Sequence, residues 1–300
     1  MPTSPAGGAR RVPRVAQGLD LAWDDFGRIV GEHANLRIHE SSTHNRTSMD
    51  TRDRSVPFYV MSYMKEGSST LRCKGREYDV GAGEALIIPP RTPHDHVMSR
   101  SGRSVFLWWH FDLLIGDSLD ILRFLQEPAV LRIDDRGRFE AQFQAHAELR
   151  RRPAMTLSAH IMRRAKSLEL LSYLLDGAQV LNFVSDRFGD VPHRFVAMLQ
   201  DVLDDPATFR HVNALAARHG LHPSHITSRF RHYFGVTPSR LGRGLLYEKA
   251  LLLIRSRDIS MEEIAFELGF SEPSSFTRFF KSMQGFSPSS LRKPGAAGRA

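Results

Sequence analysis

The chain has 300 residues, of which 41% are hydrophobic and 25% charged, with a formal net charge of +8 and a single cysteine, Cys73. This length predicts two domains of ordinary size, each able to bury a core. One cysteine excludes an internal disulfide framework and fits a reducing cytoplasm, and the lack of a run of roughly 18 apolar residues excludes a membrane-spanning helix.

The positive charge is concentrated toward the end of the sequence. Residues 206–300 hold 14 Lys and Arg against 6 Asp and Glu, whereas residues 1–205 hold 27 of each. A positive surface that neutralises phosphates gives salt-sensitive, sequence-independent affinity for nucleic acid. The last third is therefore the candidate for nucleic-acid binding, although a solvated basic face would give the same count.

The first 110 residues predict a tail followed by a β-rich domain. Residues 1–14 carry basic residues but no apolar segment after them, so we expect a disordered tail and not a secretory signal. From residue 15 to about 110, short extended segments alternate with turns rich in Gly and Pro, which predicts a β-barrel or a jelly roll. The predicted strands are Leu36–His39, Phe58–Met64, Ser69–Cys73, Arg76–Val80, Glu84–Ile88 and Val105–Phe111.

A small barrel or jelly roll can hold one small ligand in its interior. The side chains that we place near such a pocket are Tyr59, Tyr63, His94, His96, Trp108 and His110. Two histidines two residues apart on a strand project to one face, and a third could complete a metal site. We expect no metal and no cofactor, because no Glu stands at a matching spacing and the segment before Phe58 lacks a His-x-His pair. Hydrogen-bonded structural histidines and core aromatics are the alternatives.

After Phe111 the pattern changes from strand to helix. Residues 113–124 are amphipathic, and longer helices are predicted over 138–152 and 155–176. In the last of these, apolar residues recur at spacings of three and four, at Ile161, Ala165, Leu168, Leu171, Leu174 and Leu175. A linker over residues 177–190 and a helix from Val191 to Leu203 follow.

The C-terminal third contains the same segment twice, at an offset of 50 residues. SHITSRFRHYFGVTPSRL begins at Ser224, and SSFTRFFKSMQGFSPSSL begins at Ser274. Each copy follows an apolar-Ala segment that ends in Gly, a residue that adopts the left-handed conformation at helix ends. Within each copy, aromatic or aliphatic residues four apart lie on one buried helix face, so the residues between them point outward. This is the layout of a helix-turn-helix whose second helix enters a DNA major groove.

These motifs resemble a known family. Residues 208–293 resemble the tandem helix-turn-helix domain of the AraC/XylS family of bacterial transcription regulators, through LAARHGLHPSHITSRFRHYFGVTP, the A-x-x-L-I-x-S run that starts at Ala250, and IAFELGFSEPSSFTRFFKSMQGFSP. The run from Gly67 to His94 resembles the cupin-like sensor domain that precedes it in many such regulators. A helical bundle whose repeated glycines are only caps is the alternative, and two copies at a fixed offset count against it.

The resemblance implies an α+β protein in two parts. Residues 15–176 would form a cupin-like β-barrel or jelly roll with a helical extension, for ligand sensing and dimerisation. Residues 191–300 would form an all-α DNA-binding domain of two helix-turn-helix units joined by a long helix. In such regulators the sensor's helices form the dimer contact, so we expect a homodimer in which the 155–176 stripe takes part.

In function, the resemblance implies a cytoplasmic, ligand-responsive regulator that is not an enzyme. It would bind double-stranded DNA and RNA polymerase and act as an activator, with a carbohydrate as the suggested effector. Two other classes stay open: a cupin-type metal-dependent enzyme with an accessory helical domain, and an architectural DNA-binding protein without a ligand. The missing metal constellation counts against the enzyme, and a small ratio of specific to non-specific DNA affinity would mark the architectural protein.

Exposure and the motif together select the DNA-contacting residues. The base-contact candidates are Ser224, His225, Thr227 and Ser228 in the first recognition helix and Ser274, Ser275, Thr277 and Arg278 in the second. Arg278 can donate two hydrogen bonds to a guanine, and Arg231 and Lys281 are expected on phosphates. The common family pattern has Arg where this chain has Ser228, so no strong guanine contact is expected there, and Arg229 lies on a phosphate or half buried.

The two units are joined by a predicted helix over Pro238–Arg255, which begins at a proline. About 18 residues span about 27 Å, close to the ~34 Å between successive major-groove faces, so one protomer would read a long, non-palindromic half-site. Gly242 and Gly244 interrupt this connector and disfavour helix by up to ~1 kcal/mol each relative to Ala. We therefore expect its first turns to be mobile.

Overall fold

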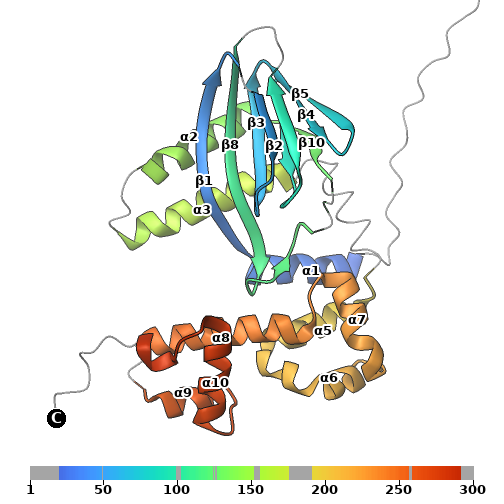
Figure 1. Cartoon of the computed structure of the whole chain (residues 1–300), viewed down its shortest axis with the longest axis vertical. Helices are drawn as coiled ribbons and strands as arrows, with labels where there is room; N and C mark the ends of the chain where they lie inside the picture. The colour runs from blue at the N-terminus through green and yellow to red at the C-terminus, as the bar shows by residue number, and fades with distance from the viewer. Residues whose placement is uncertain are drawn as a thin grey trace, which may run out of the picture.

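The computed structural model describes residues 20–48, 50–98, 103–123, 125, 127–151, 156–175, 191–256 and 259–291. The predicted tail over 1–14 and the predicted linker over 177–190 lie outside these residues. A β-rich N-terminal part, the sensor domain, lies against an all-helical C-terminal part (Figure 1). No helix within the described ranges combines the length and the apolar character needed to cross a bilayer.

The strands of the sensor domain form two antiparallel sheets. The larger sheet has the order β1 (Asn35–Arg46), β8 (Ser104–Ile115), β3 (Tyr59–Glu66), β6 (Glu84–Ile88) and β10 (Ala129–Arg132), with β9 (Leu119–Asp120) paired to β8. The smaller sheet has the order β2 (Asp50–Arg54), β7 (His94–Met98), β4 (Ser68–Cys73) and β5 (Arg76–Gly81). Among the described residues no strand pairing joins the two sheets, so of the two expected forms they build an open, cupin-like two-sheet fold and not a closed barrel.

Strand β3 lies at the centre of the larger sheet, and its first six residues are all buried. Its odd-numbered residues, such as Tyr63, join the apolar core beneath the helices, whereas Val60 and Met64 belong to the cluster between the two sheets. Alternate side chains of a strand point to opposite faces, and here both faces are covered. The sequence of β3 is therefore apolar almost throughout.

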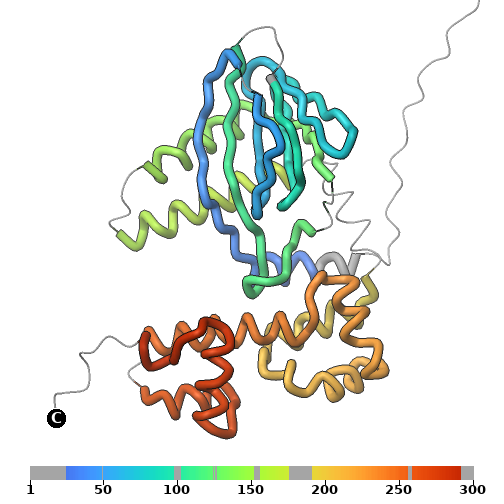
Figure 2. Tube along the Cα trace, viewed as in Figure 1, coloured from blue at the N-terminus to red at the C-terminus, as the bar shows by residue number. Residues whose placement is uncertain are grey.

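Two helices cover the outer face of the larger sheet: α2 (Arg136–Arg151) and α3 (Leu157–Leu175), close to the predicted bounds (Figure 2). The ring of Trp109 on β8 stacks on Phe143 of α2 at 6.0 Å, nearly parallel. On α3, Leu171 and Leu174 are buried in this layer, but Ile161 and Leu168 from the same predicted stripe are exposed. The stripe therefore packs on its own domain at only one end.

The prediction that strands end near residue 111 and give way to a helix over 113–124 is wrong. Strand β8 continues to Ile115, and β9 and β10 follow before the first helix of this region. Burial in this stretch alternates with period two, with Leu113 and Ile115 buried and Leu114 partly exposed, and Leu114 pairs with Asn35 of β1. The short apolar run fits a helix and a strand equally well by composition, and pairing with β1 decides between them.

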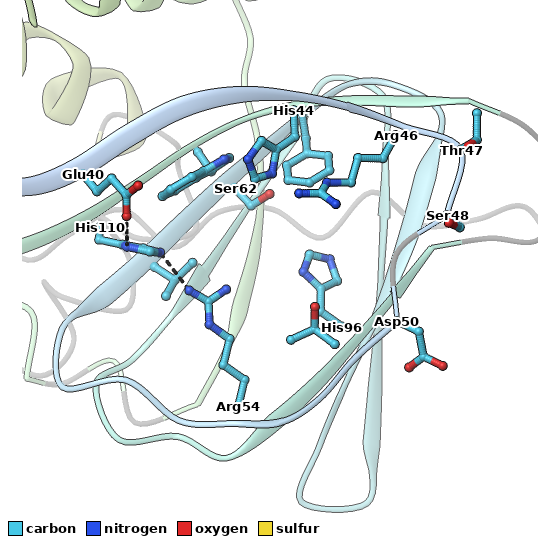
Figure 3. A pocket seen from close by; sticks show the side chains of 14 residues that line it. Glu40, His44, Arg46, Thr47, Ser48, Asp50, Arg54, Ser62, His96 and His110 are labelled. Atoms are coloured by element: carbon cyan, nitrogen blue, oxygen red, sulfur yellow. Dashed lines mark hydrogen bonds and ion pairs between the residues drawn. The ribbon is translucent and has the colours of Figure 1, made fainter.

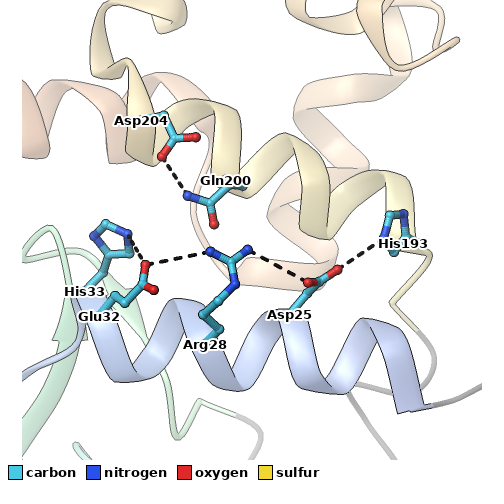
Figure 4. A network of polar contacts seen from close by, with 7 residues as sticks. All are labelled: Asp25, Arg28, Glu32, His33, His193, Gln200 and Asp204. Carbon is cyan, nitrogen blue, oxygen red and sulfur yellow. Dashed lines mark hydrogen bonds and ion pairs between the residues drawn. The ribbon is translucent and has the colours of Figure 1, made fainter.

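One helix was not predicted. Helix α1 (Asp20–His33) precedes the first strand and packs against α5 (His193–Asp204) of the C-terminal part. Phe26 and Ile29 of α1 are buried in the core. Figure 4 shows the polar side of this contact, where Asp25 lies 3.3 Å from His193 and Arg28 lies between Asp25 and Glu32. Helix α1 thus connects the two parts of the molecule.

The C-terminal part is all helical, as predicted. After α5 come η1 (Pro206–His211), α6 (Val212–Arg218), α7 (Pro223–Phe234), α8 (Pro238–Ser256), α9 (Met261–Glu267), α10 (Pro273–Gln284) and η2 (Pro288–Leu291). Helices α6 and α7 form the first helix-turn-helix unit, and α9 and α10 form the second. The long helix α8 joins them (Figure 1).

The expectation that Gly242 and Gly244 loosen the connector is corrected by their surroundings. Helix α8 runs through both glycines without a break. A methyl group at Gly242 would stand 2.7 Å from the Pro206 carbonyl oxygen, and one at Gly244 would stand 2.6 Å from the carbonyl oxygen of Gly116. Both glycines therefore permit close packing of α8, against η1 in one case and against the sensor domain in the other.

The contact between sensor domain and α8 is made by the turn that ends β8. Gly116 and Asp117 in this turn have positive φ angles of 55° and 53°. A Cβ at Gly116 would overlap the side chain of Leu245, so the turn fits directly onto α8. Arg123, a few residues further on, donates hydrogen bonds to the carbonyl oxygens of His232 and Tyr233 at 3.1 and 2.6 Å. A cation at the carbonyl end of α7 is also favoured by the helix dipole.

Candidate DNA-binding surface and effector cavity

The two candidate recognition helices, α7 and α10, begin and end in the same way. Each has 12 residues and starts with a proline at its first turn, Pro223 in one and Pro273 in the other. Each ends at a glycine in the left-handed conformation, Gly235 with φ 76° and Gly285 with φ 82°. Proline at the start and glycine just past the end are the residues that helix termini favour. The repeat in the sequence therefore becomes a repeat in structure.

Both helices are anchored by aromatic residues on one face. In α7 the buried residues are Ile226, Phe230 and Phe234, and in α10 they are Phe276, Phe279 and Phe280. In α7 all six predicted contact residues are exposed: Ser224, His225, Thr227, Ser228, Arg229 and Arg231. In α10, Ser274, Arg278 and Lys281 are exposed, whereas Ser275 and Thr277 are partly buried. The structure thus brings the predicted residues onto the outer faces of the two helices.

Two details of these helices concern arginine. Arg229 is exposed, which removes the alternative of a half-buried side chain. Arg278 donates a hydrogen bond to Ser275 Oγ at 3.1 Å, so its guanidinium lies over the first turn of α10. Arg278 is exposed, and a guanidinium has further N–H groups in a fork geometry that matches a guanine edge or a phosphate.

Sequence reasoning did not identify which basic residues of this part have structural roles. Arg210 of η1 donates to the Gly269 carbonyl oxygen at 2.8 Å, and its guanidinium lies 4.0 Å above the ring of Phe270. Arg243 of α8 donates to Ser282 Oγ at 2.7 Å. Both arginines hold the second unit against α8 and η1. The charge excess of residues 206–300 therefore overstates the charge available to phosphates.

A cavity of about 700 Å³ lies in the sensor domain between the larger sheet and strands β2 and β7 (Figure 3). Its volume falls in the range of small-molecule pockets. The lining combines charged, hydroxyl and aromatic side chains. The lining residues are Glu40, His44, Arg46, Thr47, Ser48, Asp50, Thr51, Arg54, Val60, Ser62, His96, Phe106, Trp108 and His110.

Three of the six predicted ligand residues, His96, Trp108 and His110, line this cavity. His94 is buried on the same strand as His96, and its Nδ1 lies 2.8 Å from the Thr92 carbonyl oxygen. The structure does not bring Tyr59 and Tyr63 to the cavity, because they lie on the opposite face of β3. Tyr59 donates to Asp120 at 2.8 Å and Tyr63 to Glu140 at 2.9 Å, and burial raises the pKa of both phenols.

Tyr59 lines a second, more polar cavity of about 570 Å³ at the junction of the two parts. This junction cavity also takes in Asp120 and Arg123 from the segment after β8, and Arg240 from α8. Burial raises the pKa of Asp120, which accepts the hydrogen bond from Tyr59. The tyrosine thus belongs to the contact between sensor domain and connector helix.

The histidines of the sensor cavity are neutral at pH 7. Burial lowers the pKa of His96 and of His110 to about 4, with further lowering by His94 and Arg54 at His96 and by Arg54 at His110. Arg54 Nη2 lies 3.1 Å from His110 Nε2, and since a guanidinium only donates, His110 accepts at Nε2 and carries its proton on Nδ1. His96 Nε2 lies 2.9 Å from Ser69 Oγ. These rings are therefore held by hydrogen bonds as neutral groups.

No set of three or more His, Cys, Asp and Glu side chains is arranged to hold a metal ion within the described part of the chain. The residues that sequence reasoning missed in the cavity are chiefly Arg46 and Arg54. Arg54 belongs to β2, whose sequence DTRDR carries no strand signal, and Arg46 ends a strand that was predicted to stop at His39. A basic residue on an isolated polar segment offers no signal from which its position could have been found.

Comparison with known families and proteins gives two non-overlapping domain matches. A family model described as an AraC-like ligand binding domain matches residues 40–175, and a model described as a helix-turn-helix domain matches residues 215–294. The first contains both sheets and the helices α2 and α3. The second contains both candidate recognition helices.

Individual proteins are similar to this chain over different lengths. The MmsAB operon regulatory protein of Pseudomonas aeruginosa is 26% identical over 288 residues, which are 91% of this chain and 84% of that protein. The transcriptional activator RhrA of Rhizobium meliloti is 43% identical over 65 residues, 21% of each chain. Among solved structures, ToxT from Vibrio cholerae bound to an unsaturated fatty acid aligns at 13% identity with a TM-score of 0.32, over 86% of this chain and 94% of that one.

Proposed function

This chain belongs to the AraC/XylS family of transcription regulators, and on that premise we propose that α7 and α10 bind two successive major-groove segments of one DNA duplex. The observation that carries the proposal is the matched pair of recognition helices at the two ends of α8. That helix has 19 residues, hence a length of about 28 Å, comparable to the ~34 Å between successive major-groove faces. One protomer then reads a long half-site without internal symmetry.

Within this arrangement each contact residue has a distinct role. Arg278 donates to a guanine, and Arg229, Arg231 and Lys281 hold phosphates and fix the register. The remaining base contacts come from Ser, Thr and His side chains, which discriminate weakly. The first unit therefore depends more on DNA shape than the second.

The sensor domain supplies the response to a small-molecule effector bound in the cavity between the sheets. An effector changes DNA or RNA polymerase engagement only if it binds two states of the protein with different affinity. The close contacts of the β8–β9 turn and Arg123 with α8 and α7 are the element through which such a difference would act. The regulator works as an activator in the cytoplasm, and no catalytic role is assigned to the cavity. The carbohydrate suggested by the sequence stays a prediction, and the two arginines of the cavity favour a negatively charged ligand.

A homodimer forms through the exposed apolar face of α3. Leu157, Ile161 and Leu168 are 77%, 61% and 40% exposed and recur at spacings of four and seven, so they form one stripe on the helix. Contiguous apolar residues at a surface mark protein contacts, and the buried half of the same helix already packs on its own sheet. The exposed face with Leu157, Ile161 and Leu168 is thus available to a second copy of the chain.

Selection of binding sites from genomic DNA by the purified full chain, at near-physiological salt, tests whether α7 and α10 bind two successive major-groove segments. The expected motif has two blocks about one helical turn apart. Arg278→Ala should weaken specific binding by ~1–3 kcal/mol and relax the sequence at one block only, since one bidentate contact is lost. Arg194→Ala, which removes an exposed arginine of α5 outside both units, is the matched control.

The outcomes separate the alternatives. If the Arg278→Ala variant binds its specific DNA site with unchanged affinity, α10 does not contact the major groove through this residue. A small ratio of specific to non-specific affinity would favour the architectural protein. Metal analysis of the purified protein addresses the cupin-type enzyme, which requires a bound metal ion.

A further inference from the structure

The cavity between the two sheets contains two guanidinium groups without carboxylate partners. Arg54 enters from β2 and Arg46 from the end of β1, and both extend into the space that the lining residues surround (Figure 3). Neither forms an ion pair with a carboxylate of the residues that the structure describes. The hydrogen bond of Arg54 goes to a neutral acceptor, His110 Nε2, at 3.1 Å.

The acidic groups of the same cavity do not neutralise these arginines. Asp50 lies 2.8 Å from Arg52, which stands outside the cavity lining. Glu40 is 66% exposed at its side chain and lies 3.8 Å from His110 Nδ1, which carries that ring's proton. Burial lowers the pKa values of His96 and His110 to about 4, so these rings add no charge at pH 7, and burial also lowers the pKa of His44. The charges left without a partner are therefore positive.

The Trp108 ring lines the cavity, but its donor nitrogen is closed off from it. The Trp108 indole Nε1 is buried and has no hydrogen-bond partner among the described residues. An indole nitrogen only donates, as does a guanidinium. The charged donors that a ligand in the cavity can reach are therefore the guanidinium groups of Arg46 and Arg54.

One part of the wall is apolar. Phe106 and Trp108 of β8 line the cavity with Val60 of β3, and the ring of His44 lies 5.1 Å from that of Trp108 and 5.2 Å from that of Phe106. This wall faces the ligand with ring surfaces and one aliphatic side chain. This apolar part matches a hydrocarbon or aromatic body, and the hydroxyl groups of the lining lie on Thr47, Ser48, Thr51 and Ser62.

We propose that this cavity binds a small organic carboxylate, whose carboxylate is held by Arg54 and Arg46 and whose apolar body packs on Trp108 and Phe106. An ionised carboxylate only accepts hydrogen bonds, and its two oxygens match the fork of a guanidinium. His110 acts as a positioning residue, because its Nε2 accepts from Arg54 and fixes the direction of the guanidinium. The proposal rests on the proposed function in naming this ligand as the effector.

Calorimetric titration of the full chain with matched pairs of probes tests the proposal. Benzoate is compared with benzamide and hexanoate with hexanamide, since each amide keeps the shape and loses the charge. D-xylose and glucose 6-phosphate represent a neutral sugar and a phosphate ester. The carboxylates should bind, and their amides should bind at least about 10-fold more weakly, as expected for loss of a charge-assisted hydrogen bond.

Substitutions locate the site. Arg54→Gln should lower carboxylate affinity about 10-fold or more, and Arg54→Lys should lower it less, because the charge stays and the fork is lost. Arg72→Gln is the matched control, since Arg72 lies on β4 of the same sheet and pairs with Glu77 outside the cavity. The unfolding midpoint of each variant without probe confirms that its fold is intact.

Several results would contradict the proposal that the ligand is a carboxylate. These are equal binding of an acid and its amide, unchanged affinity of Arg54→Gln, preference for glucose 6-phosphate, or no response to either carboxylate at millimolar concentration. Binding of D-xylose that Ser62→Phe abolishes would keep the cavity as the effector site and overturn only the ligand class. Arg54-dependent carboxylate binding that leaves DNA affinity unchanged would support the ligand class and remove the cavity from regulation.

Discussion

The two helix-turn-helix units have nearly the same local structure but different surroundings. The first unit, α6 and α7, shares one continuous apolar core with α1, α5 and the larger sheet, through residues such as Leu215 and Phe230. The second unit, α9 and α10, has a separate core with α8, which includes Phe276 and Phe280. Among the described residues, the sensor domain therefore holds the first unit directly and reaches the second through α8 and η1.

The two units are also held by arginines from different parts of the molecule. Arg123 of the sensor domain donates to the C-terminal end of α7, whereas Arg210 and Arg243, both from the C-terminal part, hold the second unit. A change in the sensor domain would thus move α7 first. On the proposed function, the second unit would contact DNA independently of the sensor domain, through Arg278, which has no counterpart in α7 at Ser228.

The largest expected effect comes from truncating one core phenylalanine in each unit. Phe230→Ala and Phe280→Ala each remove a fully buried ring, which destabilises by ~3–5 kcal/mol. Because Phe230 lies in the shared core, its loss should lower protection of the sensor domain as well. Loss of Phe280 should affect the second unit alone. Native-state hydrogen exchange along the chain measures this, and equal spread of the two effects would contradict the separation of the cores.

The second expected effect concerns the two glycines of α8. Helix propensity alone predicts that Gly→Ala stabilises by up to ~1 kcal/mol. At Gly244 the added methyl meets a backbone oxygen of the sensor domain, so Gly244→Ala should instead destabilise by ~1–3 kcal/mol and loosen the contact between the parts. Gly242→Ala is the comparison, because its methyl meets η1 within the C-terminal part.

Urea unfolding and limited proteolysis of both alanine variants distinguish the two contacts. Gly244→Ala should increase cleavage between the parts while leaving the DNA-binding domain folded. Gly242→Ala should weaken the DNA-binding domain itself. A stabilised Gly244→Ala protein would show that the turn after β8 does not rest on α8 in solution.

The smallest expected effect is a pH dependence of the same contact. Burial, the negative charge of Asp117 and a hydrogen bond with it raise the pKa of Glu248 on α8 to about 7, and Arg37 opposes this. Asp117 also pairs with Arg37. A raised folded-state pKa means that the stabilisation is present below the unfolded value and is lost as the pH rises through about 7. Unfolding midpoints between pH 5 and 8 should therefore fall more for the natural chain than for Glu248→Gln, and parallel curves would contradict this assignment.

The sequence predicted those elements whose signals are local. Helices α7 and α10 follow from a repeat with proline at the start and glycine at the end, and β3 to β6 follow from short apolar runs between turns. Their exposed and buried faces follow from helical periodicity alone, so the placement of Arg278 on an outer face was available from the sequence. The same holds for Trp108 and His110, which share one face of β8.

The sequence did not predict those features that depend on a distant partner. Strand β2 is polar and acquires its structure by pairing with β7, which is what brings Arg54 to the cavity. Tyr59 and Tyr63 were placed in the pocket on composition, yet a shift of one residue along a strand exchanges the two faces, and only the packing of α2 on the sheet fixes which face is which.

By itself, then, the sequence determined the two recognition helices, the long helix between them and the strand-rich sensor, because periodicity, caps and turns act within a few residues. Tertiary structure decided the rest: the end of β8, the roles of Gly242 and Gly244, and the unpaired arginines of the cavity. Each of these depends on atoms far away in the chain. Gly244, for example, disfavours a helix by local propensity, and its role in packing follows only from the carbonyl oxygen of Gly116 that lies next to it.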